Sequence, residues 1–271
     1  MTTKNERKRD DVFAESTPTA ICLEVANPTN EYIAQKRYLR GYDVESLALN
    51  CDFIDSLYLN LVGELPEEKV KDVLNQLMVA YSNLGARYVG SRAAMNAGIG
   101  RTNISHILPI ALCASSGSVD GSQAVIDAYI NISKLSKADI TDVLNQFKPF
   151  PENDLPVGEL TAGFNSLAGN RDPIANSLLK QFLKCSLDLS TTNWCSNIQD
   201  KLENTGFGIS LGGLFASICI DLKIDKKTSL VLFQIAIAPS LAAFGLEKYG
   251  KPLTEMPFLS EDKYKIEGKE D

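Results

Sequence analysis

A segment rich in arginine and glycine, Gly85–Arg101 (GARYVGSRAAMNAGIGR), is the first one suited to binding chemistry. Its arginines, Arg92 among them, can clamp carboxylates or a phosphate, because a planar guanidinium donates paired hydrogen bonds to such groups. Asn96 supplies an amide in the same segment. The composition equally fits a Gly-rich turn and a small-residue helix contact with surface arginines. Both interpretations stay open, and Arg92 and Asn96 are candidate substrate-binding residues.

A second segment, Gly163-Phe164-Asn165 followed by Gly169-Asn170-Arg171-Asp172-Pro173, runs from a Gly-rich loop into the start of a helix. The exposed amides and the dipole of a helix N-terminus form a natural anion site. Asp172 before Pro173 also predicts an ordinary N-cap, which needs no ligand. The cap is expected in either case, and Arg171 is a third candidate for substrate binding.

Several common catalytic motifs are absent. Gly85, Gly90, Gly98 and Gly100 do not form the GxGxxG pattern, and neither GKS/GKT nor GxSxG occurs. The one histidine, His106, lies in an apolar stretch, which favours a structural role over catalysis. The six cysteines form no CxxC pair, so we expect reduced, buried thiols and neither a metal site nor a disulfide framework.

Helices must position these residues, because apolar side chains recur at helical spacing along most of the chain. The pattern predicts helices over 67–82, 137–147 and 194–202, and another after Pro173. The Gly-, Ala- and Ser-rich segment Gly206–Leu222 predicts a central helix that neighbouring backbones approach closely. The apolar stretch 229–246 contains Pro239 and favours a buried helix–turn–helix over a membrane span. We find no alternating strand pattern longer than a few residues, and the expected class is all-α.

The sequence also predicts the domain organisation and the cellular location. Residues 1–20 form an expected N-terminal polar arm and residues 21–271 a helical domain, with a candidate lobe boundary near 149–157. The N-terminus lacks the apolar run of a signal peptide, which predicts a cytoplasmic protein. A formal net charge of −7 argues against a nucleic-acid-binding face.

Three stretches resemble the citrate synthase family, and most closely its short citryl-CoA lyase branch. The first is Arg40-Gly41-Tyr42-Asp43 with Leu57-Tyr58-Leu59 and Gly63-Glu64-Leu65-Pro66, the second is the Gly163–Pro173 segment, and the third is Gly206–Leu222. Order and spacing agree from about Arg40 to Gly245. The resemblance implies an all-α fold, a homodimer, and a site near the dimer contact.

The positions that the family uses for histidine hold other residues here. Asn165 takes the place of the histidine that follows Gly-Phe-Gly, and Asp120 takes that of the histidine in a Leu-His-Gly-Gly motif. An upstream substrate-binding histidine falls at Tyr88 or Val89. Because His106 is the only histidine in the chain, at least two of the three are lost in any register.

Other implied catalytic positions are also substituted. Leu211 matches the aspartate base of an Asn-Val-Asp-Gly motif, Ile174 matches the arginine of Asp-Pro-Arg, and a carboxylate-gripping arginine falls near Ile237. Citrate-type condensation needs a base for the methyl proton of the thioester, donors for the enolate and cations for the carboxylates. Aliphatic side chains supply none of these, so we expect the ordinary reaction to be abolished.

Three hypotheses follow. The first is a non-catalytic relative that binds a CoA thioester, a carboxylate or a protein partner. The second is a divergent acyltransferase or lyase that acts on a CoA thioester through Asp120, Asn165, Arg92 and Arg171. The third is a structural protein that uses only its helical dimer surface. No resident cofactor or metal is expected in any of them.

Overall fold

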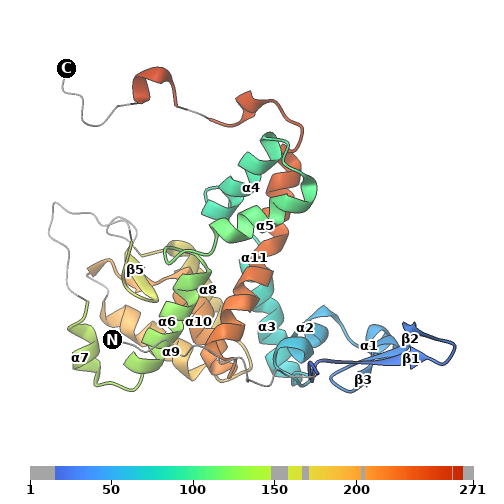
Figure 1. Ribbon diagram of the computed structural model, residues 1–271. Helices are drawn as coiled ribbons and strands as arrows, with labels where there is room; N and C mark the ends of the chain where they lie inside the picture. The colour runs from blue at the N-terminus through green and yellow to red at the C-terminus, as the bar shows by residue number, and fades with distance from the viewer. Residues whose placement is uncertain (1–15, 148–157, 167–170, 203–204, 258, 265–271) are drawn as a thin grey trace, which may run out of the picture. The chain divides into compact units, whose positions relative to one another are not determined.

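A computed structural model describes residues 16–147, 158–166, 171–202, 205–257 and 259–264 (Figure 1). The chain divides into two compact units, Met1–Pro66 and Glu67–Asp271. Most of the expected arm and the candidate lobe boundary near 149–157 lie outside the described residues. The division after Pro66 was not anticipated from the sequence.

The first unit begins with a β-hairpin. Strand β1 (Cys22–Asn27) pairs antiparallel with β2 (Asn30–Leu39), and β2 pairs with the short β3 (Tyr42–Asp43). The expectation of no strand longer than a few residues is therefore wrong. Both faces of the hairpin are largely exposed, and a register shift near Ala26 interrupts the pairing, so the sequence lacks a regular alternation of apolar residues.

Arg40 and Gly41 form the tight turn between β2 and β3. Both have positive φ, 50° and 91°, as the turns that suit hairpin twist require. The Arg40 guanidinium donates to the main-chain oxygen of Asn60 at 3.3 Å, in the last turn of α2 (Phe53–Leu61). The guanidinium also lies beside Gly63, where an added Cβ would stand 3.8 Å from Cζ. The Arg-Gly-Tyr motif thus ties the hairpin to α2, and α1 (Val44–Asn50) connects them.

The second unit is helical with one small antiparallel sheet, β4-β5-β6. Its helices are α3 (Glu68–Tyr81), α4 (Val89–Ile99), α5 (Ile104–Ala114), α6 (Ser122–Leu135), α7 (Ile140–Leu144), α8 (Pro173–Phe182), α9 (Ser190–Lys201), α10 (Leu211–Asp221) and α11 (Lys226–Lys248). Its strands are β4 (Gly158–Thr161), β5 (Phe164–Ser166) and β6 (Gly208–Ile209), and short 3-10 turns follow at Leu253–Glu255 and Glu261–Lys263.

Helix α10 is the centre of this unit. All its residues from Gly212 to Cys219 are buried, and it packs against α6, α9 and α11. Phe215 makes edge-to-face contacts with Tyr81 and Phe233, at centroid distances of 4.9 and 5.3 Å. The prediction of a closely packed central helix is confirmed, although the helix starts at Leu211 because β6 occupies the preceding residues.

Helix α11 runs without a break through Pro239, so the expected helix–turn–helix is wrong. Pro239 is exposed, and the surrounding helix packs against α3, α4, α5, α6 and α10. At Gly245 a Cβ would stand 2.1 Å from the side chain of Ile107, which shows how closely α11 and α5 approach. Within the described chain, α11 alone is long and apolar enough to cross a membrane. Its packing against five helices accounts for that composition.

Candidate functional site

Three helices, α6, α8 and α10, begin close to one another and to strand β5 (Figure 1). A Cβ at Gly212 in the first turn of α10 would lie 3.6 Å from the Cβ of Ala124 in the first turn of α6. Gly208 is the β6 partner of Asn165, and a Cβ there would lie 3.0 Å from the Cγ of Arg171, just before α8. The fold therefore gathers the segments that carry Asp120, Asn165 and Arg171.

Asp120 lies in the loop before α6 with an uncommon backbone conformation. Its φ is 53°, a left-handed region that residues other than glycine adopt rarely. The side chain is exposed, yet partial desolvation and, secondly, the charge of Asp172 raise its pKa above the usual value for aspartate. The two carboxylates, one before α6 and one at the start of α8, are therefore close enough for their charges to interact.

Asn165 is buried within the small sheet. Its side chain is 6% exposed, and its Oδ1 has no hydrogen-bond partner among the described residues. The preceding Phe164 directs its ring toward Phe147 and Trp194, and strand alternation puts Asn165 on the opposite face of β5. A buried acceptor without a donor is unfavourable in isolation, which marks this position as one that a ligand can complete.

Arg171 is engaged by the main chain. Its Nε donates to the oxygen of Phe207 at 3.0 Å, and its Nη2 donates to the oxygen of Gln199. These bonds join the start of α8 to α9 and to the residue before β6. In this structure the guanidinium holds main-chain segments together, and the substrate-binding role expected for it stays a prediction.

Asp172 forms the predicted N-cap of α8. Its Oδ1 accepts from the amides of Ile174 at 2.8 Å and Ala175 at 3.1 Å, and Pro173 occupies the first helical position. The carboxylate therefore accepts hydrogen bonds from two amides that would otherwise be free to bind an anion.

The start of α10 is held by a distant tyrosine. The Tyr81 hydroxyl donates to the main-chain oxygen of Leu211 at 2.6 Å. Tyr81 is fully buried, and its pKa is raised well above the usual value, first by burial and then by the charges of Cys219 and Asp172. Sequence reasoning missed Tyr81, which was recognised only as one apolar position of its helix.

Two of the candidate residues, Arg92 and Asn96, lie on α4. Arg92 and Asn96 are both exposed, one helical turn apart, and neither side chain forms a hydrogen bond or ion pair within the part of the chain described. Half-buried Tyr88 precedes α4, and its pKa is raised first by burial and then by the charge of Asp120. Of the two positions matched to the upstream histidine, Tyr88 thus lies near Asp120, and Val89 is exposed.

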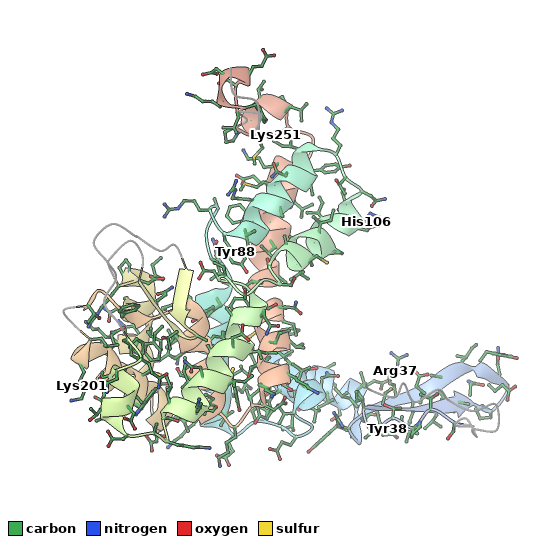
Figure 2. All side chains as sticks on the ribbon, turned by 60° about the vertical axis from the view of Figure 1, so that its left-hand side comes forward. Arg37, Tyr38, Tyr88, His106, Lys201 and Lys251 are labelled. Carbon is green, nitrogen blue, oxygen red and sulfur yellow. The ribbon has the colours of Figure 1, made fainter. Side chains whose placement is uncertain are left out.

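The remaining chemically active side chains lie elsewhere. His106 is exposed in the first turn of α5, well separated from Tyr88 in Figure 2, so the expected satisfied, structural histidine is not what the structure contains. Cys195 and Cys219 are buried as expected, but Cys22 and Cys113 are exposed. The described residues contain no cluster of three or more His, Cys, Asp or Glu able to hold a metal ion.

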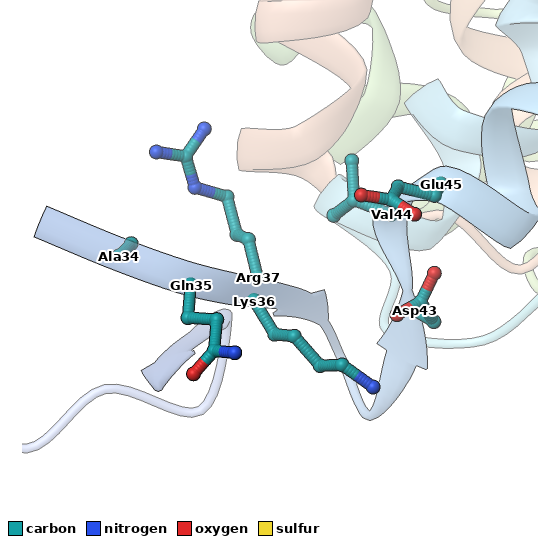
Figure 3. A pocket seen from close by; sticks show the side chains of 7 residues that line it. All are labelled: Ala34, Gln35, Lys36, Arg37, Asp43, Val44 and Glu45. Carbon is teal, nitrogen blue, oxygen red and sulfur yellow. The ribbon is translucent and has the colours of Figure 1, made fainter. Parts of the chain in front are cut away.

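Two hollows in the first unit involve none of the predicted site residues. One, of about 210 Å³, lies beside β2, where Lys36 and Arg37 point to opposite sides of the strand (Figure 3). The other, of about 240 Å³, is lined by residues of β2, α1 and the start of α2, including Cys51.

Comparison with solved structures places this arrangement in the fold of citrate synthases and citryl-CoA lyases. Citryl-CoA lyase from Hydrogenobacter thermophilus matches with a TM-score of 0.74 over 94% of this chain and 96% of that one, at 20% sequence identity. ATP citrate lyase from Methanothrix soehngenii, in complex with citrate and coenzyme A, gives 0.66 over 98% of this chain and 48% of that one, at 12% identity.

Citrate synthase from Thermoplasma acidophilum gives a TM-score of 0.56 over 79% of this chain and 58% of that one, at 13% identity. No protein-family model matches the chain, and neither does any curated protein sequence. The predicted resemblance is thus confirmed. At sequence identities of 20% and below, it shows that the fold is shared.

Proposed function

We propose that this chain binds a CoA thioester without turning it over. The observation that carries the proposal is the residue at the start of α10. The matched position holds Leu211, whose main-chain oxygen is fixed by Tyr81 and whose side chain has no atom that can take a proton. A base there is what citrate-type condensation would require.

The other matched positions support the same conclusion. Asn165 can donate or accept a hydrogen bond but cannot cycle a proton. Ile174 is 62% exposed at the start of α8, and Ile237 is fully buried in α11, so neither supplies a cation for a carboxylate. Because the loss of a single donor to a developing oxyanion lowers kcat about a hundredfold or more, the combined losses remove ordinary turnover.

Two observations bear on the choice between a CoA thioester and a free carboxylate. The citrate lyase with which this chain shares its fold was solved with citrate and coenzyme A bound. In this chain the charge of Asp172 acts on Asp120, so a free carboxylate bound beside this pair would be repelled. A cytoplasmic homodimer that acts as a sensor or an accessory subunit fits these features, and the exposed Ile104 and Ile110 of α5 offer apolar area for a dimer contact.

Calorimetry and a turnover assay test the proposal together. The purified chain is titrated with acetyl-CoA, citrate and oxaloacetate, and free thiol release is followed in the presence of acetyl-CoA and oxaloacetate. The proposal predicts saturable heat with acetyl-CoA, weak or no heat with the free acids, and no thiol release. Absence of heat with acetyl-CoA would contradict the proposal, and absence of heat with all three compounds would leave only the version in which the chain binds a protein partner.

A divergent acyltransferase or lyase is the second candidate, and Asp120 favours it. Its positive φ and raised pKa are features that recur at catalytic positions. Asp120 would then act as the base. If an activity on a CoA thioester is found, Asp120→Ala must remove it, and an unchanged rate would exclude this assignment.

A further inference from the structure

We infer that Gln199, near the end of α9, is a positioning residue of this site, because it holds strand β6 in place and, through β6, the buried side chain of Asn165. The inference rests on the proposed function, since Asn165 and Arg171 are candidate ligand contacts there. It follows from the hydrogen bonds that meet at this one residue and from the pairing of the small sheet.

The side chain of Gln199 is buried, and both of its polar atoms are engaged. It is 2% exposed. Its Oε1 accepts from the Ile209 amide at 3.0 Å, and its Nε2 donates to Oδ1 of Asn176 at 2.8 Å. Its main-chain oxygen accepts from Nη2 of Arg171. One residue of α9 therefore joins strand β6, helix α8 and the arginine that precedes α8.

Strand pairing places Asn165 on the face of the sheet that meets Gln199. Gly208 in β6 and Asn165 in β5 are directly paired, and directly opposed residues project from one face of a sheet. A Cβ added at Gly208 would lie 2.9 Å from Oε1 of Gln199 and 3.0 Å from Cγ of Arg171. The side chains of Asn165, Gln199 and Arg171 therefore share this face.

A buried glutamine is a costly way to fill space. Its amide must leave water, and its side chain loses more rotamer freedom than a leucine would. A buried polar group whose hydrogen bonds are all made contributes a unique arrangement of the segments that it joins. We therefore assign to Gln199 the fixing of β6, and with it the orientation of Asn165, whose Oδ1 has no partner among the described residues and is available to a ligand.

Two variants disturb this link from opposite sides. Gln199→Met keeps a side chain of similar length and helix propensity but removes both of its hydrogen bonds. Gly208→Ala places a methyl group against Gln199 and Arg171, at a position whose backbone lies outside the left-handed region. Each should weaken binding of acetyl-CoA to the full chain about tenfold in calorimetry, as expected for the loss of one well-placed hydrogen bond.

The matched control is Thr192→Val in the same helix. Thr192 is fully buried, and its hydroxyl bonds to Ser217 at 3.1 Å and to Asp221 at 2.8 Å, both in α10. Its loss should lower the stability of the chain and change acetyl-CoA affinity by less than about twofold, because these contacts are separate from β5 and β6.

The side-chain amide signals of Asn165 in a proton–nitrogen NMR spectrum supply a readout that lost stability alone does not move. In the ligand-free chain, Gln199→Met and Gly208→Ala should shift these signals, whereas Thr192→Val should leave them in place.

Unchanged Asn165 signals in Gln199→Met overturn the positioning role. So does acetyl-CoA binding that Gln199→Met leaves intact, or that Thr192→Val weakens as much as Gln199→Met does. If the parent chain gives no heat with acetyl-CoA, the proposed function fails instead, and the Asn165 signals alone then decide whether Gln199 positions this residue.

Discussion

Asp221, at the end of α10, caps the start of α9 from a distance. Its carboxylate accepts from the amides of Thr191 at 2.7 Å and Thr192 at 2.9 Å, and from the Thr192 hydroxyl at 2.8 Å. The residue before α9, Leu189, offers no side-chain cap of its own. The substitution Asp221→Ala would leave two amides at this helix start without an acceptor, and Thr192 is fully buried.

The size of the effect follows from those contacts. A hydrogen bond to a charged group contributes about 1.5–3 kcal/mol, and the half-exposed Thr191 amide can recover part of its loss through water. We therefore expect Asp221→Ala to lower the free energy of unfolding by about 3 kcal/mol. That is a large fraction of the roughly 5–15 kcal/mol that stabilises a typical domain.

Urea denaturation followed by far-UV circular dichroism measures this loss. Asp221→Asn keeps one acceptor and should lose about half as much. Asp225→Ala removes a matched but exposed cap from α11 and should lower stability by about 1 kcal/mol. A value for Asp221→Ala within about 0.5 kcal/mol of the parent chain would refute the reasoning, because the amides would then have another partner.

Three further predictions concern titratable groups. Because its folded pKa is raised, Asp120 contributes stability only at low pH and opposes folding once ionised. Asp120→Asn should therefore raise the free energy of unfolding at pH 7 by less than about 1 kcal/mol. Chemical denaturation at several pH values should show this gain vanish below the unfolded pKa near 4. Because the pKa of buried Tyr81 is raised, its neutral phenol contributes stability that is fully present below about pH 10 and is lost as the pH rises further. Tyr81→Phe should therefore flatten the alkaline fall in the free energy of unfolding, and an unchanged slope would contradict this. Burial raises the pKa of Cys219 to about 12 and raises that of Cys195 as well. A thiol reagent at pH 8 should therefore label the exposed Cys22 and Cys113 first, and should label Cys195 and Cys219 only after unfolding. Rapid labelling of Cys195 or Cys219 in the folded chain would count against the buried core.

Much of the fold could be predicted from local pattern. The apolar stripe over 67–82 predicted α3, and Asp172-Pro173 predicted both α8 and its cap, because these signals are contained within one or two helical turns. The hairpin was missed because its exposed strands and register shift leave no clean alternation. Helix α11 was expected to break at Pro239, whereas the exposed proline is accommodated by packing along the remainder of the helix.

The candidate site was only partly predictable. The resemblance supplied Asp120 and Asn165, and the structure brings their segments together. The bond from Tyr81 to Leu211 joins residues 130 positions apart, and no spacing rule anticipates such a contact. Likewise, the Gly-rich loop before α8 indicated an anion site with Arg171 as a substrate-binding residue, but the bonds from Arg171 to Phe207 and Gln199 depend on where α9 ends and β6 begins.

The central claim is that a citrate synthase fold persists here without the side chains that move protons. The most direct measurement is a sensitive thiol-release assay on the pure chain with acetyl-CoA and oxaloacetate, alongside a citryl-CoA cleavage assay. The account predicts rates equal to the protein-free background in both. Steady turnover in either one, proportional to the concentration of the chain, would contradict it.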